Sequence, residues 1–321
     1  MSDSSTFTHQ LESGSNEPDT TVIEGQRCRR HRNPNGSLGG WVAETAYVAP
    51  TAYIGDNAKV LDNAKVLGYA KVLGHAKVFG TATVCGTAKV YGYARIFDNA
   101  RVLDCAQVLD NAQVSGNAWI SGTVKVYGYA RIFDNAQVLD YVKVYGHARI
   151  SGYARISGKA LVYDNAQVYF NAWISGNAWI FDNAKVSGNT WIFGNARISG
   201  NAWIYGNANV YDNAQVSGNT WIYGHAKVYG YAQVLDHAQV LDSAKVSGNA
   251  CIYGHAQVLG YARIFGYAKV LDYAQVFGYA KIHGKAELFG KADVSGNSRV
   301  FTLGRLTSRA HVTNGIRGFI A

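Results

Sequence analysis

Small or β-branched apolar residues alternate with polar or larger residues along most of the chain, in a unit of six residues. The unit reads Ala, then Lys, Arg, Gln or Trp, then Val or Ile, then Leu, Phe, Tyr or Ser, then Gly or Asp, then Asn, Tyr or His, as in residues 58–63 and 94–99. Counted in sixes from Ala46 to Asn297, 42 units follow one another without a change of register. The first position is Ala in 38 of these units, and the third is Val or Ile in all but one. Such regularity is typical of a structural repeat.

The alternation within each unit predicts a short strand with its first and third side chains on one side. The Gly or Asp that follows tolerates positive φ better than most residues do, so it predicts a corner after each strand. Short repeats of this kind stack as a parallel β-helix, with three units in each triangular coil. We therefore predict an all-β, single-stranded parallel β-helix of about 15 coils between Gly40 and Gly315, roughly 70 Å long. Its Ala and Val interior is too narrow to enclose a ligand, so any site must lie on the outside.

The repeat resembles that of the bacterial hexapeptide-repeat family over about 85% of the chain. The segment Gly39, Gly40, Trp41 and Val42 that opens it also resembles uncharacterised YdcK-like and phage-associated members. This resemblance implies a left-handed β-helix. Many members of the family are acyltransferases that use acyl-CoA, usually as trimers, with a His as general base on or near a loop that leaves the helix. No loop interrupts the 42 units of this chain.

Composition divides the chain of 321 residues into three parts. Residues 1–39 are polar and are expected to be largely disordered, with a possible cap just before the repeat. Residues 40–315 form the β-helix, which becomes degenerate after residue 297, and residues 316–321 form a C-terminal end or cap. The net charge of +9 belongs to the solenoid, since residues 1–39 hold four Arg and five acids. The lack of a signal-like or membrane-spanning apolar run favours a cytoplasmic protein with no membrane partner, or one associated with a phage particle.

Residues 18 apart stack on one face of such a coil, so the surface can be read from the sequence. Two basic ladders lie in the N-terminal half, one on each of two faces, and could bind phosphate groups or acidic polymers or merely keep the surface soluble. The first ladder is Lys71, Lys89, Lys125 and Lys143, and the second is Lys59, Lys77, Arg95, Arg131 and Arg149. Asp98, Asp134 and Asp140 at nearby corners reduce this positive field.

Aromatic side chains concentrate in the middle of the chain and are candidates for a contact surface. The tryptophans on the three faces are Trp173 and Trp191, Trp203 and Trp221, and Trp179, and a further row holds Tyr127, Tyr145 and Tyr163. The alternative is that aromatics favour strands and stack on one another. Rows of corner Asn are interpreted as structural ladders of amide hydrogen bonds.

The His and Cys residues give little evidence for a catalytic site, a metal site or a disulfide. His237 and His255 are 18 residues apart and are the only catalytic candidates, but no third metal ligand aligns with them, so no metal site is expected. The four Cys at positions 28, 85, 105 and 251 have neither metal-ligand nor disulfide spacing.

Three functions remain open. The favoured one is a non-catalytic rod that presents aromatic and basic faces for self-association, as a trimer or in lateral or end-to-end contacts, or for binding a protein or polysaccharide partner. The alternatives are an acyltransferase that uses acyl-CoA, its only expected cofactor, and a binding module for polysaccharide or nucleic acid, of which nucleic acid is the less favoured ligand.

Overall fold

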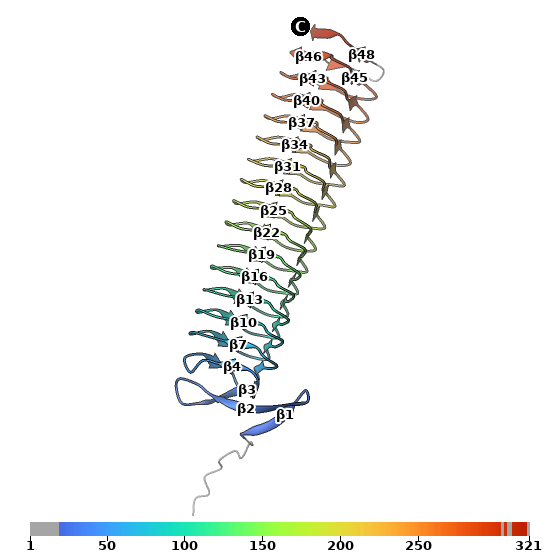
Figure 1. Ribbon diagram of the computed structural model, residues 1–321. Coiled ribbons are helices and arrows are strands. Elements are labelled where there is room, and N and C mark those ends of the chain that lie inside the picture. Colours follow the sequence, from blue (N-terminus) through green and yellow to red (C-terminus); the bar gives the residue numbers. More distant parts are fainter. Residues whose placement is uncertain (1–18, 303–304, 307–309, 320–321) are drawn as a thin grey trace, which may run out of the picture.

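The chain forms a long, straight rod of stacked coils (Figure 1). The computed structural model describes residues 19–302, 305–306 and 310–319. These residues contain 49 strands and no helix. None of the described segments is a helix long and apolar enough to cross a membrane. The all-β solenoid predicted from the six-residue unit is thereby confirmed.

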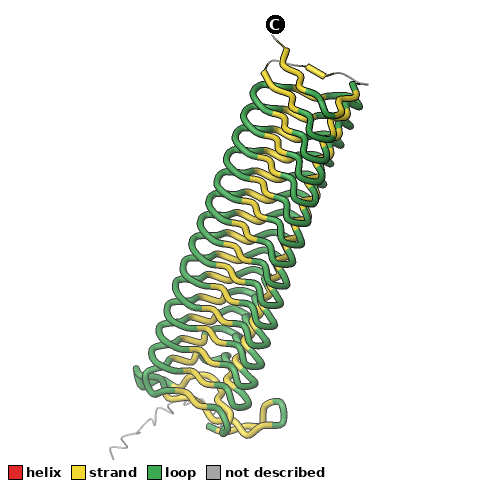
Figure 2. Tube along the Cα trace, turned by 45° about the horizontal axis from the view of Figure 1, so that its top comes forward, coloured by secondary structure: helices red, strands yellow, loops and turns green. Residues whose placement is uncertain are grey.

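Each unit contributes one two-residue strand, formed by its second and third positions. The first is β4 (Tyr47–Val48), each later strand begins six residues further on, and the series runs to β44 (Glu287–Leu288). Every strand of this series pairs in parallel with the strand 18 residues away, as Lys59 does with Lys77. Backbone N–H groups donate to carbonyls of the next coil, for example Lys59 N to Ala76 O at 3.0 Å. Three flat faces result, one for each of the three sheets, and Figure 2 shows strands stacked in columns along the rod.

The three faces are named here by the strands that they contain. Face I holds β3 (Leu38–Ala43) and every third strand from β6 (Lys59–Val60) to β48 (His311–Thr313). Face II holds every third strand from β4 to β46 (Arg299–Thr302), followed by β49 (Ile316–Phe319). Face III holds every third strand from β5 (Tyr53–Ile54) to β47 (Arg305–Leu306). The three sheets have 18, 16 and 15 strands, and the first count includes two strands that precede the solenoid, so about 15 coils are stacked.

The interior is a single column of first- and third-position side chains. From Ala52 to Val300 the Ala, Val, Ile and Leu residues of these positions are essentially inaccessible to solvent. Small and β-branched residues predominate, because three strands converge on a narrow axis. Thr190 and Thr220 replace Ala in this column, and neither buried hydroxyl has a hydrogen-bond partner among the described residues.

The corners explain why the fifth position is restricted to Gly or Asp. Most of these residues have positive φ, for example 56° at Asp98 and 66° at Gly116. The carboxylate of an Asp also bonds to the coil above: Asp98 Oδ2 accepts from Gly116 N at 2.9 Å. Phe170 takes the same conformation with φ of 59°, which costs a bulky residue about 1–2 kcal/mol.

Corner asparagines form the ladders that the sequence predicts. Asn177, Asn195 and Asn213 are joined in series by amide hydrogen bonds of 3.0 Å. Asn171, Asn189 and Asn207 form a second series, at 3.1 and 3.2 Å. These bonds tie each coil to the next along the edges of the rod.

Ordered strands occupy much of the segment that composition predicts to be largely disordered. Strand β1 (Thr20–Ile23) pairs antiparallel with β2 (Gln26–Arg32), and β2 pairs antiparallel with β3. This three-stranded unit lies across the N-terminal end of the rod (Figure 1). The expectation of disorder is thus wrong for residues 20–32, because antiparallel pairing with the first coil gives their backbone groups partners. Residues 1–18 lie outside the described part of the chain.

Asn33 and the Gly39–Gly40 pair fit this cap to the first coil. The buried Asn33 side-chain amide accepts a hydrogen bond from Ile54 N at 2.8 Å and donates one to Ile54 O at 3.1 Å. It thus makes the hydrogen bonds to Ile54 that the backbone of a further strand would make. A Cβ on Gly39 would lie 2.2 Å from Ile54 O, and one on Gly40 would lie 2.3 Å from Ala58 O. Glycine is therefore required here by the close approach of two backbones.

The last coil is shorter than the others. Arg299 pairs with Ile316, 17 residues away instead of 18. Strand β45 (Asp293–Ser295) still pairs with β48 at the regular spacing, so the repeat persists into residues 311–313. A C-terminal cap of residues 316–321 stays a prediction, although residues 316–319 do form the last strand of face II.

Candidate functional site

The aromatic residues singled out from the sequence lie in the predicted rows. The rings of Tyr127, Tyr145, Tyr163 and Phe181 stack with centroids 4.8–5.0 Å apart on face III. Each ring covers its neighbours, and burial raises the pKa of the three tyrosines. The stacking explains the row structurally, and its role as a contact surface stays a prediction.

The tryptophans differ in how much of their surface remains available. Arg197 lies over the ring of Trp179 at 4.8 Å, and Lys185 lies over that of Trp203 at 4.6 Å. Trp203 and Trp221 stack on face I with centroids 5.9 Å apart. Cations of the protein itself therefore occupy part of the aromatic surface on faces I and III.

Trp173 and Trp191 on face II form a pair that is slightly more exposed than Trp203 and Trp221. Their rings meet edge to face at 5.4 Å and 61°, and they are 44% and 50% exposed. With Ser175 and Phe193 they line a shallow, mainly apolar hollow of about 230 Å³. We call these four residues the Trp platform.

The N-terminal basic ladders are assembled as predicted, but their charges are partly neutralised or interrupted. On face I, Lys77 forms an ion pair with Glu24 at 2.6 Å, and the Arg95 guanidinium lies over Phe79 at 5.3 Å. The carboxylates of Asp98 and Asp134 border the groove at Arg131. On face III, Gln107 separates Lys89 from Lys125.

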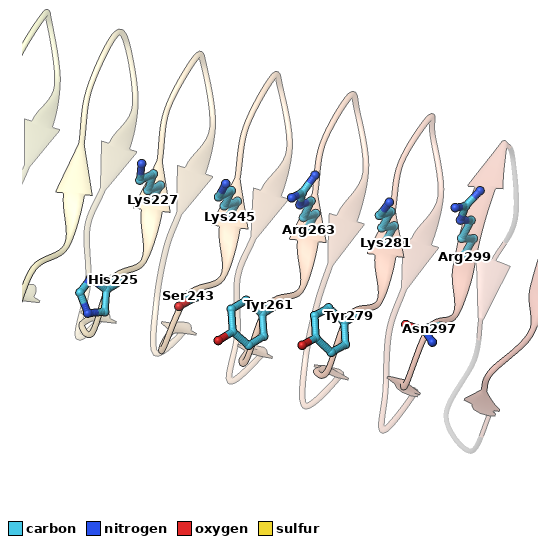
Figure 3. Close-up of a pocket in the computed structure, with 10 residues that line it drawn as sticks. All are labelled: His225, Lys227, Ser243, Lys245, Tyr261, Arg263, Tyr279, Lys281, Asn297 and Arg299. Carbon is cyan, nitrogen blue, oxygen red and sulfur yellow. The ribbon is translucent and has the colours of Figure 1, made fainter.

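A third basic ladder lies in the C-terminal half of face II, where the sequence interpretation did not place one. It consists of five consecutive cations, one in each coil: Lys227, Lys245, Arg263, Lys281 and Arg299. Their side chains project from successive strands in the same direction, and corner residues lie beside them (Figure 3). The signal was present in the sequence, because these residues are 18 apart.

This ladder forms one side of a shallow groove of about 610 Å³. Its other side is made by the corner residues His225, Ser243, Tyr261, Tyr279 and Asn297. The Tyr261 and Tyr279 rings stack at 5.0 Å, and their hydroxyl groups point outward (Figure 3). We call the five cations and five corner residues together the basic groove.

The basic groove contains no acidic residue, and in the described part of the chain none of its five cations forms an ion pair. On face III, two cations in the same C-terminal coils form ion pairs. Lys269 and Arg305 both contact Glu287, at 3.1 and 3.0 Å. Hydrogen bonds from Lys269 and Arg305 hold the pKa of Glu287 below its usual value. The carboxylate of Asp242, at a nearby corner, accepts from Gly260 N. The five cations of the basic groove thus have no acidic partner among the described residues, and they follow one another without interruption.

His237 and His255 do not form a recognisable catalytic arrangement. Their rings stack on each other at 4.6 Å, and His255 stacks on Tyr273 at 4.9 Å. Neither ring is held by a carboxylate in the hydrogen bonds of the described residues, as a general base would require. Within the same residues no three His, Cys, Asp or Glu side chains come together as a metal site would need.

Comparisons with known proteins agree with the repeat. A family model described as "YdcK Beta solenoid repeat" matches residues 191–206, and this match confirms the resemblance inferred from the sequence. No curated protein sequence matches the chain.

Solved structures with some likeness include two UDP-N-acetylglucosamine acyltransferases. The one from Francisella novicida is 15% identical with a TM-score of 0.25, over 57% of this chain and 66% of that chain. The one from Arabidopsis is 11% identical with a TM-score of 0.27, over 64% and 66%. The chain thus spans a little under two thirds of each. Likeness at this level carries no argument about activity.

Proposed function

We propose that this hexapeptide-repeat β-solenoid, with its YdcK-type repeat, is a non-catalytic interaction rod that binds an extended anionic partner along face II. The observation that supports this is the basic groove, with five successive cations and no acidic residue in its lining. Such an array concentrates positive potential and favours the binding of anions by release of their counterions.

The spacing of the cations suits a partner that is long and straight. Parallel strands lie roughly 4.8 Å apart, so the five cations extend over about 19 Å along the rod. A compact anion would meet only two or three of them, whereas an extended chain of charges can follow all five.

The acyltransferase alternative has no comparable support in the geometry. It needs a positioned general base, and His237 and His255 face each other and Tyr273. Self-association is the competing use of the exposed aromatics, and light scattering after size exclusion would reveal it as a discrete oligomer or an open polymer.

Reversing the groove charges tests the proposal. The variant K245E/R263E/K281E should bind dextran sulfate about 100-fold more weakly than wild type, and the slope of log K against log salt should fall by about three. The reason is that three counterion-releasing contacts are lost. Affinity is measured by titration at several salt concentrations, with circular dichroism as the check on folding.

A matched control is available on face III. The variant K71E/K89E/K125E makes the same change in net charge in an interrupted ladder, and we expect it to weaken binding by less than about tenfold. Equal losses in the two variants would show that net charge, and not the groove, determines binding, which would contradict the proposal.

A further inference from the structure

The basic groove and the Trp platform lie in line on the same face. Strands β25 (Trp173–Ile174), β28 (Trp191–Ile192) and β31 (Asn209–Val210) pair in sequence on face II. Strand β31 pairs with β34 (Lys227–Val228), where the basic groove begins. From Trp173 to Arg299 there are eight successive coils, a length of about 34 Å. On face II one uncharged residue, Asn209, lies between the Trp platform and the basic groove.

The two parts recognise different chemistry. Exposed tryptophan rings bind the apolar faces of sugar rings by dispersion, and cations bind carboxylate or sulfate groups. A linear polymer that carries both features can use the whole face. We propose that face II binds an acidic polysaccharide lengthwise, with sugar rings on the Trp platform and anionic groups along the basic groove. This inference rests on the proposed function and specifies the partner.

Single-stranded nucleic acid fits the basic groove less well. Proteins that bind it place successive bases on open aromatic faces. In the basic groove, however, Tyr261 and Tyr279 stack at 5.0 Å, so each covers the face of the other and no base can enter between them. Their hydroxyl groups can instead donate hydrogen bonds to sugar or carboxylate oxygens.

Duplex nucleic acid fits less well because of its shape. Each strand of a duplex winds around the helix axis, whereas the five cations form a straight row along the rod, as Figure 3 shows. Such a row could meet only the short part of a winding backbone that crosses it. A single polysaccharide chain is not constrained by a partner strand and can extend along a flat face.

The experiment compares two pairs of tryptophans and three polymers. The variant W173A/W191A removes the two tryptophan rings of the Trp platform, and the control W203A/W221A makes the same change on face I. The polymers are polygalacturonate, which has sugar rings and carboxylates, polyphosphate, which has charge without rings, and poly(dT). Binding is titrated at several salt concentrations, and melting temperatures check that the variants fold.

We expect W173A/W191A to weaken polygalacturonate binding by about tenfold or more, and to leave polyphosphate binding unchanged. The control W203A/W221A should change neither. Tighter binding of poly(dT) than of polygalacturonate, lost in W173A/W191A, would overturn the inference in favour of nucleic acid.

Two further outcomes test the polysaccharide inference and the proposed function separately. If W173A/W191A binds polygalacturonate as wild type does, the inference fails, while a salt-dependent interaction at the basic groove still supports the anionic partner. If wild type binds none of the polymers, the proposed function itself fails.

Discussion

Deleting residues 202–207 should leave a folded rod that binds polygalacturonate about tenfold more weakly and polyphosphate unchanged. These six residues form one unit on face I, and they hold no charged side chain. The core accepts the deletion, because the first and third positions of all three faces carry the same kinds of residues. Every later unit, however, moves to the preceding face. The basic groove then lies on face I, and the Trp platform remains on face II.

Deleting residues 196–213 provides the matched control. It removes one whole coil, including the same Trp203, and leaves the net charge unchanged because it takes out one Arg and one Asp. The faces keep their alignment, and Lys227 then follows directly after Trp191. We expect polygalacturonate affinity close to that of wild type. Equal affinity in the two deletion variants would show that alignment of the Trp platform with the basic groove is irrelevant.

Replacing Gly40 by alanine should detach the N-terminal cap. The new Cβ would lie 2.3 Å from the carbonyl oxygens of both Ala58 and Gly55, which belong to the backbone of the first coil and cannot move independently. We expect a loss of about 3 kcal/mol in local stability. In a solenoid each coil contacts only its neighbours, so residues 20–57 should open first. The uncovered strand edge should then pair with other molecules.

Hydrogen exchange and light scattering measure these two effects. Amide protection should fall in residues 20–57 and persist in the central coils, and the variant should self-associate with increasing concentration. Gly315→Ala is the control, since its Cβ would lie 3.8 Å from the nearest atom, an ordinary contact. A monodisperse Gly40→Ala variant with wild-type protection would refute the role given to this glycine.

The solenoid fold could be predicted from the repeat of the six-residue unit. The same repeat predicts which surface residues stack on one another. Ala at the first position, and Val or Ile at the third, imply a narrow core, and the absence of insertions means that every residue stacks on the one 18 positions away. The stacks of Tyr127 on Tyr145 and of His237 on His255 follow directly from that spacing.

The strands of the N-terminal cap could not be predicted in this way, because residues 19–39 do not repeat. Their order depends on antiparallel pairing of β2 with β3 and on one side chain, that of Asn33, in place of a strand. These are contacts between different segments, and the polar composition of the segment alone suggests disorder.

The basic groove was accessible to sequence reasoning only in part. The series from Lys227 to Arg299 could be found by counting in steps of 18. Its distinction from the N-terminal ladders could be predicted only in part: Gln107 and Gln113, which interrupt those ladders, are visible in the sequence, whereas the ion pair of Lys77 with Glu24 of the cap is not. Tyr261 and Tyr279 border the groove from a neighbouring corner, which only the coil geometry establishes.

Hydroxyl-radical footprinting with bound polygalacturonate tests the use of face II most directly, because tryptophans on all three faces report in one experiment. We expect protection of Trp173, Trp191, Tyr261 and Tyr279, and unchanged oxidation of Trp203 and Trp221 on face I and of Trp179 on face III. Equal protection on the three faces, or protection confined to face I, would contradict the proposal that this rod binds its partner along face II.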